Sequence, residues 1–157
     1  MIVALVLLLL GALLLLSQGS LASDFGGTGD VTLNDKVAQL AHAIATAEGF
    51  FKPGTIPATY HNPGDLGPKD CPGYPSAAHS GSNVAILPDD ATGWNFLAQK
   101  CMRILTGASS VNAGKGLNAT FTDVAQKYAG DWQNWLNNVT DELGVSADTT
   151  LADWLAQ

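Results

Sequence analysis

The apolar residues between Val37 and Ile44 recur at the spacing of a helix, and they include one acidic residue in their pattern. With 100° per residue counted from Val37, further apolar residues fall within about 60° of it: Leu40, Ala41 and Ile44. Glu48 falls at about 20°, in the middle of this stripe. The polar residues of the segment fall on the opposite side: Lys36, Gln39, His42 and Thr46. We therefore expect a helix that carries Glu48 on its buried face.

Local signals mark both ends of this helix. The segment from Thr32 to Asp35 loosely resembles a capping box, with Asp where Glu or Gln is usual, so we expect the helix to begin near Asn34. Gly49 follows Glu48 directly and is a typical helix-stopping residue. The pattern thus predicts that Glu48 lies in the last turn of the helix.

The position of Glu48 suggests chemistry. A carboxyl group on an apolar face is partly desolvated, which favours its protonated form. A general acid that works near neutral pH needs this property. Only two of the 14 acidic residues are glutamates, so composition alone does not explain a glutamate here. The alternative is an ordinary solvated carboxylate at a helix end that frays before its last turn.

The middle of the chain reads as loops and one small hairpin. Residues 53–64 are rich in Pro and Gly and are expected to be non-helical. Residues 83–87 form the best strand pattern, and we expect them to pair with residues 65–67. Residues 71–82 are expected to be a loop.

The rest of the chain is expected to be helical. A helix over residues 91–105 would bury a stripe at helical spacing: Trp94, Leu97, Ala98, Cys101, Ile104 and Leu105. Further helices are expected at residues 122–129, at 132–143 before Gly144, and at 151–155 after a cap at Asp148 or Thr149. The pattern predicts a mainly α protein of the α+β type, a helical bundle with a small β-hairpin.

The N-terminal residues read as a targeting segment. Residues 2–16 are apolar apart from Gly11, and Ser20-Leu21-Ala22 suits a cleavage site. We expect a signal peptide at residues 1–22, a linker at 23–33 and one domain at 34–157, exported to a periplasm or secreted. Because no Lys or Arg precedes the apolar run, an uncleaved membrane anchor is the alternative.

Charge restricts the partners. The chain has 7 Lys and Arg against 14 Asp and Glu, a formal net charge of −7. This argues against nucleic acid as a partner and suits a neutral or amine-bearing ligand. We expect no metal and no cofactor, because His61, His79 and Asp65 are too scattered to indicate a metal site.

The two cysteines are Cys71 and Cys101. In an exported protein a disulfide is the default expectation, and it would close a 31-residue loop worth roughly 3–4 kcal/mol. The alternative is two buried thiols.

Several segments in this order carry a resemblance to a known family. The segments Ala45–Gly49 and Tyr60–Leu66 are similar to the "AEG…NNPGNL" pattern of the lysozyme-like superfamily, within its soluble lytic transglycosylase and phage-lysozyme-like group. Further similar segments span most of the remaining chain: Gly93-Trp94, residues 121–129 and residues 143–146. The resemblance implies a lysozyme-like fold in which the hairpin flanks an active-site cleft.

The resemblance also implies an activity, namely cleavage of the β-1,4 bond between N-acetylmuramic acid and N-acetylglucosamine in peptidoglycan. Glu48 matches the family's catalytic glutamate, and Tyr60, Asn62 and Asp65 lie in the loop that binds substrate. Tyr128 falls where such folds often place a cleft-facing tyrosine, although a core role is as well supported.

A single glutamate suits a lytic transglycosylase, which forms a 1,6-anhydro product, working as a monomer on glycan strands. Three alternatives remain open: a two-carboxylate lysozyme, a chitinase-type hydrolase, and a glycan-binding or structural module without turnover.

Overall fold

The computed structural model describes residues 31–79 and 81–157. The elements, in order, are helices α2 (Leu33–Ala47) and α3 (Ile56–Thr59), strands β1 (Ser76–His79) and β2 (Ser82–Ala85), helix α4 (Asp90–Leu105), the 3-10 helices η1 (Ser110–Asn112) and η2 (Gly116–Asn118), and helices α5 (Phe121–Tyr128), α6 (Trp132–Leu143) and α7 (Leu151–Leu155). The expected mainly α class with a small antiparallel sheet is confirmed for these residues. The expected signal peptide and most of the linker lie outside them.

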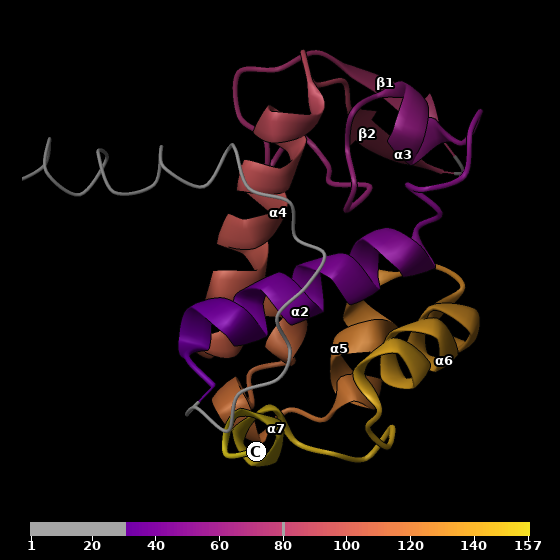
Figure 1. Ribbon diagram of the computed structural model, residues 1–157. Coiled ribbons are helices and arrows are strands. Elements are labelled where there is room, and N and C mark those ends of the chain that lie inside the picture. The colour runs from indigo at the N-terminus through magenta and orange to yellow at the C-terminus, as the bar shows by residue number, and fades with distance from the viewer. Residues whose placement is uncertain (1–30, 80) are drawn as a thin grey trace, which may run out of the picture. The chain divides into compact units, whose positions relative to one another are not determined.

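Helix α4 joins two groups of elements. It runs from the lobe that holds α3 and the hairpin to the lobe that holds α5, α6 and α7, and α2 crosses it (Figure 1). α2 packs on α4 and α6, and α5 packs on α6. The largest fully buried apolar side chains come from α2, α4, α5, α6, α7 and strand β2: Leu40, Ile44, Val84, Leu97, Ile104, Leu105, Phe121, Val124, Val139 and Leu151.

The ends of most helices follow from local sequence. The Thr32 hydroxyl accepts a hydrogen bond from the Asp35 N–H (3.2 Å), and the Asp35 carboxylate accepts one from the Thr32 N–H (2.9 Å). This is the expected capping box, with Asp in the role of Glu. Helices α4 to α7 begin and end within one residue of expectation, although Thr150 caps α7 in place of Asp148 or Thr149.

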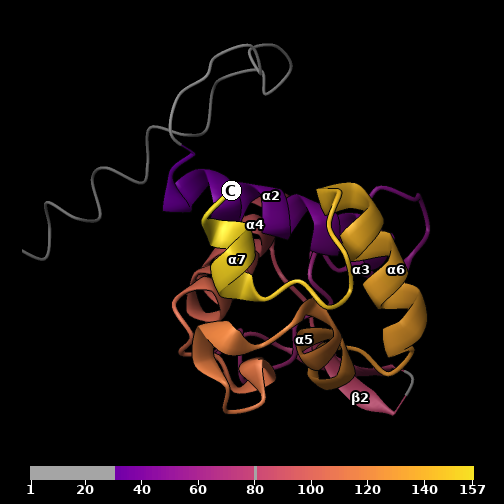
Figure 2. The same ribbon diagram turned by 90° about the horizontal axis from the view of Figure 1, so that it is seen from below.

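The first and last helices of the described residues are joined by a cation–π contact. Lys36 is 5 % exposed, and its ammonium group lies 4.6 Å from the centre of the Trp154 ring, a cation–π contact. In the view from below, α7 lies next to the first turns of α2 (Figure 2). Burial lowers the pKa of Lys36. The C-terminal helix thus covers the start of α2.

Two expectations for the middle of the chain are wrong. Helix α3 forms inside the Pro/Gly-rich passage, because Pro57 lies in its first turn, where a backbone N–H has no intrahelical partner. The partner of the second strand is β1, within residues expected to be a loop, and Ser76 pairs with Ala85 in its register. β1 was missed because it is short and half exposed, without apolar alternation. In place of the expected pairing, the Leu66 carbonyl accepts a hydrogen bond from the Ala85 N–H of β2 (2.9 Å).

The expected disulfide is also absent. Cys71 and Cys101 are free thiols, and both are fully buried in the core. Burial raises the pKa of the Cys71 thiol to about 11, and it raises the pKa of Cys101 further still. The alternative of two buried thiols is therefore correct: each cysteine packs as a small apolar residue.

The start of α4 touches the loop before it so closely that only glycine fits. A Cβ atom on Gly93 would collide with the carbonyl oxygen of His61 and would lie 2.7 Å from the Pro63 Cδ. We expect Gly93→Ala to destabilise the fold by about 2 kcal/mol and to lower Tm by about 5 °C. The matched control is Gly130→Ala, because nothing lies within 4 Å of a Cβ there. Thermal melting of both variants tests this, and equal melting temperatures would contradict it.

Candidate active site

The end of α2 fixes the position of Glu48. The Glu48 N–H still donates to the Ile44 carbonyl (2.9 Å), so the helix does not fray before this residue. Gly49 then takes a left-handed conformation (φ 76°), and the Phe50 N–H donates to the Ala45 carbonyl (2.9 Å). This is a Schellman ending, for which glycine is the usual residue. Glu48 therefore has a fixed backbone and a defined direction.

The Glu48 side chain is held in a poorly solvated position. The Trp135 indole N–H donates a hydrogen bond to its Oε1 (2.9 Å). Burial raises the pKa of Glu48 to about 8, the negative charge of Asp65 adds to this effect, and the indole hydrogen bond opposes it. The carboxyl group therefore carries a proton at neutral pH, as the sequence pattern indicated.

Glu48 lines a cleft with a volume of about 470 Å³. The end of α2 points between the hairpin on one side and α6 on the other (Figure 1). The walls come from α2, the Asp65 loop, the hairpin and the α5–α6 region: Ala47, Glu48, Asp65, His79, Gly81, Ser82, Tyr128, Ala129, Gly130, Asp131, Asn134 and Trp135. This volume lies within the range of small-molecule binding sites.

Asp65 is a second carboxyl group in the same cleft. It has a left-handed backbone (φ 48°), and its Oδ1 is buried without a hydrogen-bond partner among the described residues. Burial raises the pKa of Asp65, and His79 on the hairpin partly offsets this. The structure thus places Glu48 and Asp65 in the same cleft.

Asn62 supports the cleft from beneath and does not line it. The side chain is 0 % exposed. Its amide nitrogen donates to the Leu66 and Ala85 carbonyls, and its amide oxygen accepts from the Leu66 N–H, each at 2.9 Å. The expected contact between Asn62 and substrate is therefore wrong, because the amide is already used to hold the loop against the hairpin.

The two predicted tyrosines have different positions. Tyr128 lines the cleft, stacks on Trp135 with ring centres 4.8 Å apart, and donates a hydrogen bond to the Gly64 carbonyl (2.9 Å). Burial raises the pKa of Tyr128 well above its usual value, so it stays a neutral donor. Tyr128 therefore lines the cleft and also packs against the hydrophobic core. Tyr60 is half-buried at the end of α3 and does not line this cleft.

Among the cleft residues that sequence reasoning missed are Trp135, which contacts Glu48, and His79, whose charge acts on Asp65. Trp135 lies 87 positions after Glu48, and no local pattern indicates such a contact. His79 lies on the strand that was expected to be a loop. Within the described residues, no group of three or more His, Cys, Asp or Glu side chains could hold a metal ion. Nor is any helix among them long and apolar enough to cross a membrane.

Comparisons of the chain with protein-family models, with curated proteins and with solved structures found no match.

The raised pKa of Glu48 predicts how stability depends on pH. The unfolded chain releases this proton near the ordinary value of 4.5, whereas the folded chain keeps it up to about 8. The contribution of Glu48 to the free energy of unfolding is therefore highest below about pH 4.5 and falls as the pH rises to about 8. Glu48→Gln removes this loss, so we expect the variant to be more stable than the parent above about pH 8, by about 2–4 kcal/mol.

Urea unfolding at both ends of this pH range measures the difference. The control is the same change at the other glutamate, Glu142, which is exposed and pairs with His42. Identical pH profiles for the parent and Glu48→Gln would show that Glu48 titrates normally.

Proposed function

We propose that the protein cleaves the β-1,4 bond between N-acetylmuramic acid and N-acetylglucosamine in peptidoglycan, with Glu48 as the catalytic acid. The observation that carries this proposal is a proton-bearing carboxyl group inside a cleft, held there by the Trp135 indole. Glycosidic cleavage needs a protonated acid within reach of the leaving oxygen. A group with a pKa near 8 supplies that proton at neutral pH.

We propose further that the fold is lysozyme-like. The order of elements supports this: a helix that ends in glutamate, an irregular loop, a hairpin beside the cleft, and then helices. The sequence similarities at Ala45–Gly49 and Tyr60–Leu66 fall at the cleft and at the loop beneath it. His61 and Asp65 stand where the family commonly has asparagine. Both have a left-handed backbone, a conformation in which Asn, Asp and His are all enriched, so these two replacements keep the loop's geometry.

In the proposed reaction Glu48 acts alone as acid and then as base. Its proton goes to the glycosidic oxygen, and the bond from the muramyl C1 to that oxygen breaks. The muramyl 6-hydroxyl oxygen then bonds to C1, which closes a 1,6-anhydro ring. The proton of that hydroxyl passes to the Glu48 carboxylate. Between these two proton transfers Glu48 is ionised. The Trp135 N–H stabilises it in that state, because a hydrogen bond to the charged form favours that form.

A second candidate is hydrolysis by two carboxyl groups, and the position of Asp65 favours it. Asp65 lines the same cleft as Glu48 and has a buried oxygen without a partner among the described residues. Ionised Asp65 would serve as the nucleophile or base of such an enzyme. Burial raises its pKa, however, which disfavours the ionised form that either role needs.

The expected setting of this activity is part of the proposal. An enzyme that acts on peptidoglycan must reach the wall, which suits export through the N-terminal apolar segment of residues 2–16, cleaved or retained as an anchor. Its partner would be the glycan strands of the wall, and a monomer suffices because the cleft is built from one chain.

Glu48→Gln tests the central proposal. Gln keeps the size of the side chain and an oxygen for the Trp135 N–H, but it cannot donate an acid's proton. We expect activity to fall at least about 100-fold, with the thermal melting curve near neutral pH showing a folded protein. Loss of turbidity of purified cell walls measures the rate, and Glu142→Gln is the control. Parent activity should also fall as the pH rises above about 8, because Glu48 then loses its proton. A Glu48→Gln variant that clears walls at the parental rate rules the proposal out.

The nature of the products separates the two candidate mechanisms. We expect digests to contain 1,6-anhydromuramyl ends, and we expect Asp65→Asn to reduce activity far less than Glu48→Gln does. Mass spectrometry distinguishes the two outcomes, because a hydrolysed end is heavier than an anhydro end by one water. Reducing ends only, together with an inactive Asp65→Asn variant, would establish the two-carboxylate hydrolase instead.

A further inference from the structure

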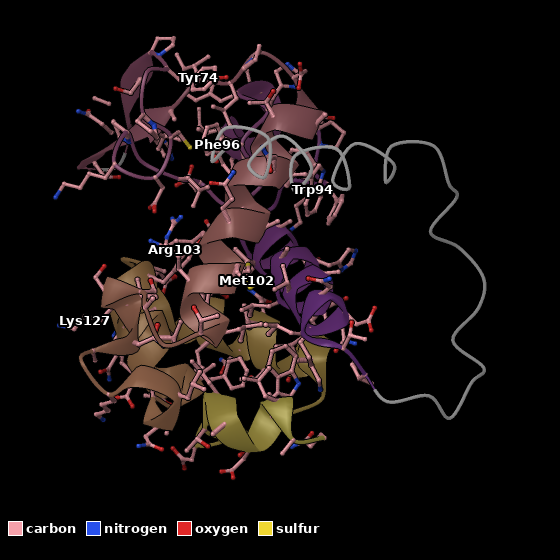
Figure 3. All side chains as sticks on the ribbon, turned by 90° about the vertical axis from the view of Figure 1, so that its left-hand side faces the viewer. Tyr74, Trp94, Phe96, Met102, Arg103 and Lys127 are labelled. Atoms are coloured by element: carbon pink, nitrogen blue, oxygen red, sulfur yellow. The ribbon has the colours of Figure 1, made fainter. Side chains whose placement is uncertain are left out.

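The cleft is lined by three carboxyl groups and by one side chain that can carry a positive charge. The carboxyl groups are those of Glu48, Asp65 and Asp131. The basic side chain is that of His79 on the hairpin. Arg103 and Lys127 lie on the same side of α4 (Figure 3), and neither lines the cleft. Among the described residues that line the cleft, His79 is therefore the one possible cation.

The backbone holds His79 and Asp65 on neighbouring walls of the cleft. His79 ends β1, and β1 pairs with β2 along its whole length. The loop with Asp65 is attached to the same β2, because the Leu66 carbonyl accepts from the Ala85 N–H (2.9 Å) and the buried Asn62 amide bonds to both of these residues. Both side chains are thus carried by segments that β2 holds together.

The charges of three cleft residues act on one another in a row. Burial raises the pKa of Asp65, and the charge of His79 opposes this effect. Burial also raises the pKa of Glu48, to about 8, and the charge of Asp65 adds to it. Glu48 therefore keeps its proton at neutral pH, whereas Asp65 has a cation that acts against its protonation. Two acids whose surroundings differ in this way can take different roles in one site.

Other titratable groups also face Asp65, and they do not replace His79. In the cleft they are Glu48 on α2, Tyr128 on α5 and Asp131 at the start of α6. A smaller cavity, of about 230 Å³, is lined by Asp65 together with Asp70, Lys100 and Lys127. Tyr128 stays neutral because burial raises its pKa, and Lys100 pairs with Asp70 at 3.0 Å. The cation that acts on Asp65 is His79.

We propose that His79 is a positioning residue of the proposed reaction: its positive charge favours the ionised form of Asp65, so that the cleft holds one ionised and one protonated carboxyl group. This inference rests on the proposed function. When the bond from the muramyl C1 breaks, positive charge develops on the sugar. A negative charge already in place in the cleft stabilises it. Asp65 forms no bond to the sugar in this role, which is therefore distinct from that of a nucleophile or base.

A simpler role for His79 is to support the hairpin that it ends. Two substitutions separate charge from structure. His79→Gln removes the positive charge, whereas His79→Lys keeps one on a side chain of similar length. A purely structural role predicts that both variants change the melting temperature alike and leave the ionisation of Asp65 as it is in the parent.

Carbon-13 NMR of the side-chain carboxyl groups measures the ionisation of Asp65 directly, and the variants Asp65→Asn and Glu48→Gln assign the signals. We expect His79→Gln to raise the midpoint of the Asp65 titration by about half a pH unit or more. His79→Lys should return the midpoint to the parental value or below it. His42→Gln is the matched control, because His42 also pairs with a carboxylate, that of Glu142, but does not line the cleft.

Clearing of purified walls over the same pH range links this ionisation to the reaction. We expect the acid limb of parental activity to follow the midpoint of Asp65. Below that midpoint His79→Gln should lower the rate about three-fold, the change in ionised fraction that half a pH unit produces, and His79→Lys should restore it. Because His79 acts through Asp65, adding His79→Gln to Asp65→Asn should cost no further activity.

The outcomes separate this inference from the proposed function. An unchanged Asp65 midpoint in His79→Gln overturns the inference, and so does a shifted midpoint with an unchanged pH profile of activity. A His79→Lys variant that behaves like His79→Gln assigns the residue to the hairpin alone and also overturns it. In each of these cases wall clearing by the parent leaves the proposed function standing. A parent that clears no walls at any pH rejects the proposed function, and the inference falls with it.

Discussion

The hydrogen bond from the Trp135 indole to the Glu48 carboxyl joins the two helices on which the cleft depends. α2 delivers Glu48 at its end, and α6 packs along α2 and supplies the indole. The same indole stacks on Tyr128, whose hydroxyl donates a hydrogen bond to the carbonyl of Gly64, the residue before Asp65. One aromatic pair therefore sets both the position of the acid and the distance across to the loop that carries Asp65.

The loop beneath the cleft is held by a different constraint. Asn62 is buried and uses both ends of its amide to fasten the loop to its own Leu66 and to Ala85 on β2. The left-handed residues His61 and Asp65 lie on either side of this anchor. The turn therefore projects the Asp65 side chain into the cleft while its backbone stays fixed. Asn62, which the sequence resemblance assigns to substrate binding, instead supports the cleft from below.

Short-range physics made much of this predictable. The capping box at Thr32, the Asp89 cap of α4 and the left-handed Gly144 that closes α6 are all encoded within a few residues, so the sequence located these helices closely. The placement of Glu48 on an apolar face was predictable for the same reason. The partner of β2, the free state of Cys71 and the indole on Glu48 depend on contacts between distant segments. No periodicity in the sequence reports such contacts, and β1 offers no apolar alternation that would have revealed it.

The nearness of Glu48 and Asp65 has a consequence for how the cleft holds protons. Each carboxyl group is partly buried, and the charge of Asp65 raises the pKa of Glu48. The pKa of each acid therefore depends on whether the other is ionised. When one of the two acids ionises, the other therefore holds its proton more firmly. Its acid strength is set jointly by the helix end and the loop, two segments that the chain brings together only when it folds.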